Sequence, residues 1–190
     1  MTQVIGGFAA LELHPNILAA VIATGYEEPS AIQAMSIPVI LAGDDMIGQA
    51  QTGTGKTAAF ALPILSRIDP AKREPQALIL APTRELALQV ASAFETYAKQ
   101  MPGVNVIAVY GGAPMGPQLK AIRNGAQIIV ATPGRLVDHM RRDEKVLSTV
   151  RHLVLDEADE MLKLGFMDDL EVIFKGIPAE RQTVLFSATL

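Results

Sequence analysis

The sequence predicts an α/β fold in which a mainly parallel sheet carries helices on both faces. From residue 45 onward, short apolar runs alternate with longer segments of helical periodicity. This alternation is typical of βαβ crossovers, which build parallel sheets. A glycine-rich loop follows the first run, at the end of a strand where such sheets bind ligands. With 190 residues and 49% hydrophobic content, the chain can bury one sizeable core.

The first 34 residues are predicted to form a helical segment that belongs to the same domain as residues 35–190. Apolar and polar residues alternate there at helical spacing. Pro15 suits the first turn of a helix, and Gly25 suits its end. We therefore expect helices to precede the first strand.

Six short apolar runs are predicted to form buried strands. They are residues 46–47, 77–80, 104–110, 128–130, 152–155 and 183–186. Between two of these runs, residues 83–100 place Leu86, Val90, Phe94 and Tyr97 on one face of a helix. The sequence contains no internal repeat and no linker, so a single domain is expected.

Residues 50–57, Ala-Gln-Thr-Gly-Thr-Gly-Lys-Thr, form a glycine-rich loop that leads into helix-compatible sequence. Glycines let consecutive backbone N–H groups face one anion, and the helix that follows adds its positive dipole end. Lys56 can reach the outer phosphates of a nucleotide, and the Thr57 hydroxyl can bind Mg²⁺. Ala50 stands where the general phosphate-loop pattern has glycine. The loop predicts a site for a magnesium nucleotide.

Asp156 and Glu157 follow the apolar run at residues 152–155 and supply the acidic element that a phosphate loop needs. Mg²⁺ requires a carboxylate, and the attacking water must be oriented. We expect Asp156 to bind the metal and Glu157 to act as the base that orients water. The alternative is a helix whose first turn favours acidic residues through its dipole. The phosphate loop favours the first interpretation.

Composition limits the kinds of site and partner. A net charge of −4 excludes a broad positive field for nucleic acid, so any such site must be local. The chain has no cysteine, and its three histidines, His14, His139 and His152, lack metal-ligand spacing. No apolar run approaches 18 residues, and the N-terminus lacks the basic segment of a secretory signal. We therefore expect a cytoplasmic protein without a membrane partner.

Residues 156–159, Asp-Glu-Ala-Asp, spell the signature of the DEAD-box RNA helicases. The chain resembles this family, in the family's order, at residues 25–33 (the Q motif), 50–57, 82–87, 111–112, 132–135, 156–159 and 187–189. Phe8 stands 17 residues before Gly25, where the family carries an isolated aromatic residue. Residues 103–106 and 159–162 also resemble the bacterial cold-shock branch. The resemblance implies a RecA-like P-loop domain that binds ATP, Mg²⁺ and RNA.

The resemblance also implies a role for individual residues. The catalytic residues are Lys56, Asp156 and Glu157, and the metal ligands are Thr57 and Asp156. The nucleotide contacts are Phe8, Tyr26, Gln33, Thr52, Gly53, Thr54, Gly55, Lys56 and Thr57. The RNA backbone contacts are Pro82, Thr83, Arg84, Gly111, Gly112, Thr132, Pro133, Gly134 and Arg135. Asp159, Ser187 and Thr189 couple the nucleotide site to a second domain.

Three of the nucleotide contacts have a simpler interpretation. Ser30 and Gln33 have the spacing of a capping box, in which Gln33 returns to the N-terminus of its own helix; the family resemblance favours adenine recognition instead. Phe8 can stack an exposed ring on adenine or anchor the N-terminal segment. Tyr26 can contact the nucleotide or pack as a staple ahead of the helix.

The predicted RNA contacts also have structural alternatives. Arg84 and Arg135 can be solvated residues at helix starts, and Gly111-Gly112 can be a plain turn. Asp159, Ser187 and Thr189 can form a cap. We expect no stacking aromatic residue and no base-reading side chain near these motifs, which favours a grip on the RNA backbone without sequence specificity. Residues 139–145, which mix both signs of charge, are predicted to be a solvated helix end.

The resemblance implies the first of two RecA-like domains, because the sequence stops at Leu190, one residue after Thr189. The second domain would supply the arginines that complete the ATP site. We therefore expect this chain to bind ATP and hydrolyse it negligibly. A related DNA translocase is disfavoured by Asp159 and by the motif around Gln33. An RNA-binding clamp controlled by nucleotide, without useful turnover, remains the alternative, and the oligomeric state stays open.

Overall fold

The structure, a computed structural model, describes residues 7–26 and 28–190. In this part of the chain one six-stranded parallel sheet has the order β1-β6-β5-β2-β4-β3. The strands are β1 (Met46–Gln49), β2 (Ala77–Leu80), β3 (Val106–Val109), β4 (Ile128–Ala131), β5 (His152–Leu155) and β6 (Gln182–Ser187). The predicted parallel sheet is confirmed. Residues 1–6 of the predicted N-terminal helical segment lie outside the described residues, as does Glu27 of the Q motif.

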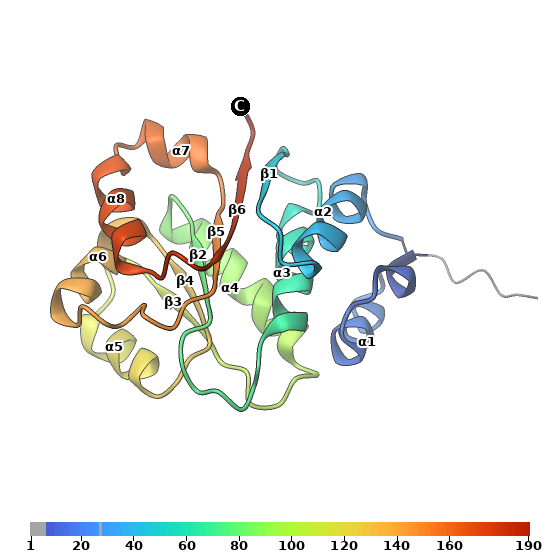
Figure 1. Cartoon of the computed structure of the whole chain (residues 1–190), viewed down its shortest axis with the longest axis horizontal. Coiled ribbons are helices and arrows are strands. Elements are labelled where there is room, and N and C mark those ends of the chain that lie inside the picture. Colours follow the sequence, from blue (N-terminus) through green and yellow to red (C-terminus); the bar gives the residue numbers. More distant parts are fainter. Residues whose placement is uncertain (1–6, 27) are drawn as a thin grey trace, which may run out of the picture.

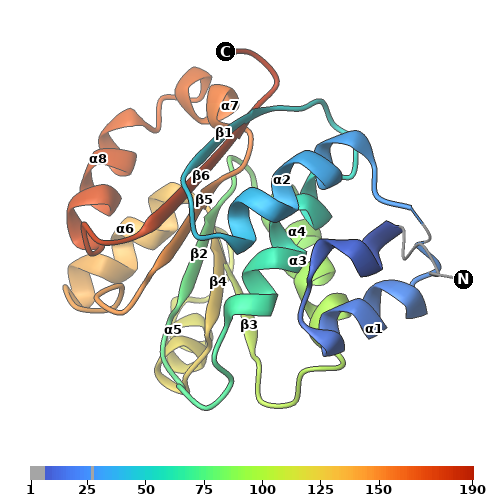
Figure 2. The ribbon, with the colours of Figure 1, turned by 45° about the vertical axis from the view of Figure 1, so that its right-hand side comes forward.

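Helices cover both faces of the sheet, as predicted (Figure 1). They are α1 (Pro15–Ala23), α2 (Ala31–Leu41), α3 (Lys56–Arg67), α4 (Arg84–Ala98), α5 (Met115–Arg123), α6 (Pro133–Arg142), α7 (Ala158–Lys163) and α8 (Met167–Gly176), with a 3₁₀-helix η1 (Gly7–Leu11) at the start. Figures 1 and 2 show α1 to α4 on one face and α5 to α8 on the other. None of the helices in the described ranges is long and apolar enough to cross a membrane.

The burial of each strand explains its sequence. All four residues are buried in each of β2, β4 and β5, because helices cover both of their faces. Strands β2 and β4 are unbroken aliphatic runs, and β5 is aliphatic after His152. The outer strands β1 and β3 are only partly buried, and β1 carries the exposed Ile47. Residues that alternate along a strand enter separate cores. Ile79 packs with α3 and α4, whereas Leu78 and Leu80 pack with α6.

The register of the sheet brings all strand ends to one edge. Leu80 of β2 pairs with Ala131 of β4 and with Leu155 of β5, and Ala131 also pairs with Val109 of β3. At the other side of the sheet, Gln49 of β1 pairs with Ser187 of β6. Because all strands are parallel, the segments that follow them emerge side by side at the carboxyl edge.

The N-terminal helices pack into the same core as α3 and α4. Ile17 and Val21 of α1 and Ile37 and Ile40 of α2 are fully buried there. Helix α1 begins at Pro15 and Gly25 has φ +84°, so both expected helix signals lie where a helix starts and ends. This half of the core supports the loop that follows β1.

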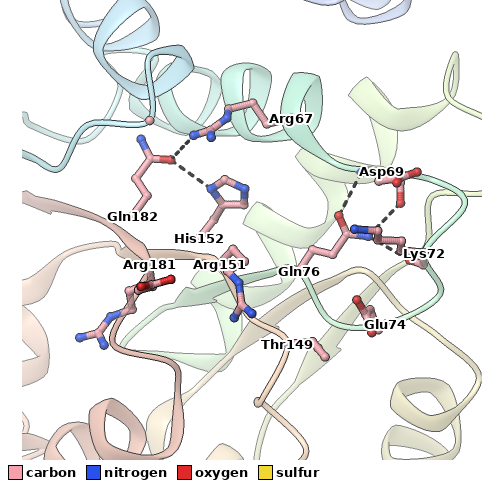
Figure 3. Close-up of a pocket in the computed structure, with 12 residues that line it drawn as sticks. Arg67, Asp69, Lys72, Glu74, Gln76, Thr149, Arg151, His152, Arg181 and Gln182 are labelled. Carbon is pink, nitrogen blue, oxygen red and sulfur yellow. Dashed lines mark hydrogen bonds between the residues drawn. The ribbon is translucent and has the colours of Figure 1, made fainter.

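His152 belongs to a polar network at the opposite, amino edge of the sheet, in a hollow of about 610 Å³ (Figure 3). The Nε2 of Gln182 donates to the carbonyls of Ile40 and Asp44, so its Oε1 faces His152 Nδ1 at 3.0 Å and accepts from Arg67 Nη1 at 3.0 Å. His152 therefore carries its proton on Nδ1. Burial lowers the pKa of His152.

Replacing His152 by Asn is expected to flatten the pH dependence of stability. Below pH 6.5 the unfolded chain protonates this histidine while the folded chain, with its lowered pKa, does not, so wild type loses stability as pH falls. The slope from one such group reaches about 1.4 kcal/mol per pH unit. Asn is chosen because its amide still donates to Gln182. Urea unfolding of the chain at pH 7.5, 6.5 and 5.5 measures the slope.

The second buried histidine, His139, bears on how much of the slope remains after that substitution. Buried His139, whose pKa is also lowered, should account for part of the slope that His152→Asn leaves behind. A His152→Asn chain that loses as much stability as wild type between pH 7.5 and 5.5 would contradict this account.

Candidate functional site

The strand order sorts the predicted site residues into two groups along the carboxyl edge. The loops after β1, β6 and β5 are neighbours in the sheet and contain residues 50–57, 187–189 and 156–157. The loops after β2, β4 and β3 are neighbours on the other half and contain residues 82–84, 132–135 and 111–112. The phosphate loop and the acidic pair thus share one half of the edge, and the predicted RNA contacts share the other.

The phosphate loop takes its shape from two left-handed glycines. Gly53 has φ +86° and Gly55 has φ +80°, a region that other residues enter at a cost. Thr54 Oγ1 donates to the Gln51 carbonyl at 2.7 Å, which closes the turn. Helix α3 begins directly after Gly55, at Lys56, so its unpaired N–H groups point into the loop. Residues 51–55 are exposed, as a ligand-binding loop requires.

Lys56 and Asp156 form a buried ion pair between the ends of β1 and β5. Lys56 Nζ lies 2.9 Å from Asp156 Oδ1, and the two side chains are 9% and 0% exposed. Burial raises the pKa of the Asp156 carboxyl, and the Lys56 charge opposes that rise. The structure therefore joins two predicted catalytic residues that lie 100 positions apart in the sequence.

Glu157 adopts a strained backbone beside this pair. Its φ of +55° and ψ of +53° are left-handed, an uncommon conformation for a glutamate that often marks a functional position. One carboxylate oxygen lies 4.0 Å from Lys56 Nζ, and the side chain is 26% exposed. Burial raises the pKa of Glu157; Lys56 opposes the rise, and the neighbouring Asp156 adds to it. A carboxylate with a raised pKa suits a general base.

The residues around the ion pair fit Mg²⁺. Asp156 Oδ2 is buried without a hydrogen-bond partner among the described residues, and Thr57 offers a hydroxyl in the first turn of α3. Hard oxygen ligands of this kind suit Mg²⁺, which commonly takes one or two ligands from protein and the rest from phosphates and water. In residues 7–26 and 28–190 no group of three His, Cys, Asp or Glu side chains gathers to hold a metal on its own.

Gln33 forms the capping box that the sequence offered as its alternative role. Ser30 N donates to Gln33 Oε1 at 2.9 Å, and Gln33 N donates to Ser30 Oγ at 3.4 Å. The same side chains hold the phosphate loop, because Gln33 Nε2 donates to the Gly55 carbonyl and Ser30 Oγ to the Thr54 carbonyl. One N–H and one lone pair of the amide remain for adenine. Contact with adenine stays a prediction.

Gly55→Ala is expected to destabilise the chain more than Gly53→Ala. Both glycines have φ near +80°, so both substitutions cost about 1–2 kcal/mol in backbone strain. A Cβ at Gly55 would also collide with Gln33 Nε2, whereas a Cβ at Gly53 would meet no heavy atom within 4 Å. Moving the amide aside breaks its bond to the Gly55 carbonyl, which adds about 0.5–1.5 kcal/mol. Urea unfolding of both variants measures the difference, and equal losses would count against the Gln33 contact.

The structure corrects the expected exposure of Phe8. Its ring is 3% exposed and packs in the core beside α1 and α2. It stacks on Tyr26 with ring centroids 6.3 Å apart, and Tyr26 is 46% exposed. Phe8 therefore anchors the N-terminal segment, the alternative considered for it. Its contact with adenine stays a prediction that requires the ring to become accessible.

On the other half of the edge, Arg84 and Arg135 contact protein groups. The Arg84 guanidinium lies over the Tyr110 ring, 4.9 Å from its centroid. Arg135, whose side chain is 14% exposed, donates to the Ala113 carbonyl at 2.8 Å. The solvated-residue alternative is therefore wrong for Arg135. Tyr110 directly precedes Gly111, and the Arg84 guanidinium lies over its ring, so the expectation that no aromatic residue stacks on RNA bases here stays a prediction.

Sequence reasoning missed Gln118 and misjudged His139. Gln118 is 7% exposed and contacts both Arg135 and His139. His139 is fully buried, although residues 139–145 were predicted to be solvated; Arg141 and Arg142 are exposed as predicted. The sequence signal was the helical spacing of Arg135 and His139, which lie four residues apart on one face of α6.

The three residues of the predicted coupling relay are also joined. Thr189 Oγ1 donates to Asp159 Oδ2 at 3.1 Å, and Ser187 Oγ donates to the Thr189 carbonyl at 2.6 Å. These bonds link the end of β6 to the first turn of α7, next to Glu157. Their role in coupling to a second domain stays a prediction.

Comparison with known proteins identifies the family. The family model described as DEAD/DEAH box helicase matches residues 30–190. The chain belongs to this family. The DEAD-box domain has a solved relative, a DEAD box protein from the hyperthermophile Methanococcus jannaschii, with a TM-score of 0.92 and 41% identity over 98% of this chain and 51% of that one. The RecA-like α/β fold is thereby confirmed.

Curated relatives indicate the branch of the DEAD-box family. The protein is 55% identical over 183 residues to the ATP-dependent RNA helicase DeaD of Mycobacterium tuberculosis and 56% identical over 183 residues to that of Escherichia coli K12. These alignments cover 96% of this chain and 32% and 29% of the relatives, so the chain spans about a third of their length. They support the predicted resemblance to the bacterial cold-shock branch.

Proposed function

We propose that this chain is the ATP- and RNA-binding first domain of an ATP-dependent RNA helicase. The observation that carries the proposal is the arrangement of the carboxyl edge, where the phosphate loop and the Lys56–Asp156 pair adjoin the glycine loop and arginine motifs. Residues 1–34, with the Q motif, belong to the same domain as residues 35–190. The bacterial relatives named DeaD support this assignment. We also propose a cytoplasmic location, which the absence of cysteine supports.

The nucleotide half of the edge would bind ATP through the residues predicted from the sequence. The left-handed glycines would turn backbone N–H groups toward the phosphates, Gln33 and Tyr26 would contact the adenine, and Thr57 and Asp156 would hold Mg²⁺. When bound, the metal neutralises charge on the phosphates. Binding of Mg-ATP would draw Lys56 from Asp156 toward the phosphates. Glu157 would then accept a proton from the attacking water.

The other half would bind the RNA backbone. Gly111, Gly112, Thr83 and Arg84 are exposed at neighbouring strand ends. Backbone N–H groups, hydroxyls and arginines recognise phosphate and sugar without reading bases. A local site of this kind agrees with a net charge of −4. We expect little sequence specificity.

A second RecA-like domain is proposed to complete both sites. An arginine that reaches the γ-phosphate from outside contributes about 10³–10⁵ in rate in related phosphoryl-transfer enzymes. Residues 1–190 alone should therefore bind ATP with negligible turnover, and the two-domain protein should couple turnover to RNA strand separation. The alternative for this chain by itself is a nucleotide-dependent RNA clamp without useful turnover.

One assay tests the proposal: ATP and GTP turnover with and without RNA, on residues 1–190 and on the chain extended through the second domain. We expect RNA-stimulated turnover of ATP, in preference to GTP, by the two-domain protein alone. Strong RNA-stimulated turnover by residues 1–190 would refute the proposal that these residues form only half of the ATP site. A two-domain protein that binds RNA in the presence of ATP without turnover would be a clamp.

A further inference from the structure

Gln118 stands between two predicted RNA-binding loops that are separate in sequence. It lies in α5, is 7% exposed, and contacts three groups from two other segments, the loop after β3 and helix α6. Its Nε2 donates to the Tyr110 carbonyl at 3.1 Å, directly before the glycine pair. Its Oε1 accepts from Arg135 Nη1 at 3.2 Å and lies 3.2 Å from His139 Nε2. One buried amide thus joins the loop after β3 to the loop and helix after β4.

The three contacts determine the orientation of the amide and the tautomer of the histidine. A carbonyl accepts only, so the Tyr110 carbonyl must face the NH₂ group of Gln118. The amide oxygen then faces Arg135 and His139, and His139 must carry its proton on Nε2 to donate to it. His139 Nδ1 is buried without a hydrogen-bond partner in the described part of the chain, which agrees with a neutral ring. Burial and the nearby Arg135 and Arg142 lower the pKa of His139.

The same cluster reaches the third predicted RNA motif. Arg84, after β2, lies over the ring of Tyr110, whose carbonyl Gln118 holds. Arg135 adds a second link, since its Nη1 also donates to the Ala113 carbonyl on the far side of the glycine pair. Both ends of the Gly111-Gly112 turn are therefore held by side chains, while the two glycines themselves are exposed.

We propose that Gln118 is a positioning residue for RNA binding: its amide fixes the Gly111-Gly112 turn relative to Arg135, so that the two loops present one preformed surface to the RNA backbone. This inference rests on the proposed function of the site. Arg135 mainly connects the two loops, because its Nη1 already donates to Ala113 and Gln118 and its side chain is only 14% exposed. Preformed donors bind phosphate without the entropic cost of ordering a glycine turn.

The test replaces Gln118 by Met, which keeps the length of the side chain and removes all three hydrogen bonds. In the two-domain protein, affinity for single-stranded RNA should fall about tenfold, the effect of one to two lost hydrogen bonds. Affinity for ADP without RNA should stay within about twofold of wild type. Gln89→Met, an exposed glutamine in α4, is the matched control and should leave both affinities unchanged.

A double-mutant cycle with Arg135→Met separates positioning from a general structural role. If Gln118 acts through Arg135, the double variant should bind RNA no more weakly than Arg135→Met alone. Additive losses, or an ADP affinity that falls by the same factor as the RNA affinity, would overturn the proposal. If the Met variant does not fold, Gln118→Glu replaces it in the test. Glu keeps the acceptor for Arg135 and His139 and places a carboxylate against the Tyr110 carbonyl, so the bond to the turn is lost.

The two proposals fail in different ways. A wild-type two-domain protein that does not bind RNA overturns both the proposed function and the role of Gln118. A wild-type protein that binds RNA, with a Gln118→Met or Gln118→Glu variant of equal RNA affinity, overturns the positioning role alone. A Gln118 variant that loses RNA affinity, keeps its ADP affinity and is not additive with Arg135→Met supports the positioning role.

Discussion

Replacing Glu157 by Gln in the two-domain protein is expected to lower ATP turnover by about 10²–10⁴, the usual contribution of a general base. Gln has the same size and hydrogen-bonding reach as Glu but cannot accept the proton of water. The left-handed backbone at position 157 is as strained for Gln as for Glu. Mg-ATP binding and stability should therefore stay close to wild type. Steady-state phosphate release and binding of a fluorescent ATP analogue measure the two effects separately.

Glu160→Gln, one turn along α7, is the matched control for that substitution. Glu160 forms a surface pair with Lys163 at 3.2 Å and should leave turnover within about twofold of wild type. Turnover by Glu157→Gln equal to that of wild type would remove Glu157 from the mechanism. An equal fall in both variants would point to the charge of the acidic segment rather than to a single base.

Replacing Lys56 by Met is expected to destabilise the 190-residue chain by about 3–5 kcal/mol at pH 8, apart from its effect on nucleotide binding. Met retains most of the apolar stem, so the loss comes from Asp156, a carboxylate with 0% exposure that is left without its cation. Asp156→Asn in the same chain should restore most of the loss, because a neutral amide needs no counter-ion. Urea unfolding of wild type and of the two variants measures the effect.

The pH dependence of that loss has a defined sign. Burial raises the pKa of Asp156, and removing Lys56 removes the charge that opposes the rise. As pH falls from 8, the folded variant takes up a proton that the unfolded chain does not, so the variant regains stability toward lower pH. Lys163→Met, which breaks an exposed pair, should cost less than about 1 kcal/mol at either pH. A pH-independent loss in Lys56→Met would contradict the buried-charge explanation.

The nucleotide half of the edge could be predicted from the sequence because its signals are local. The glycines at positions 53 and 55, the lysine after them and the acidic pair after an aliphatic run each follow from a few neighbouring residues. Parallel strands then bring these segments to one edge. The sequence also contained both interpretations of Gln33, and the geometry accommodates both, since one amide caps α2, holds Gly55 and retains a donor and an acceptor.

The exposure of single side chains was less predictable. Phe8 and His139 were expected at the surface, yet both are buried, because Phe8 packs beside α1 and α2 and His139 lies against Gln118 of α5. Gln118 carried no local signal at all. Its importance arises from three partners at positions 110, 135 and 139, which only the folded chain brings within hydrogen-bond distance.

The sequence alone determined the class of fold, the position of each strand, and the placement of the motifs at strand ends, because hydrophobic periodicity and glycine conformations act over a few residues. The tertiary structure alone decided the strand order, which places the ends of β1, β6 and β5 in one half and those of β2, β4 and β3 in the other. Packing across the whole sheet sets this order. The separation of the predicted nucleotide and RNA surfaces, and the Lys56–Asp156 pair within the nucleotide half, follow from it.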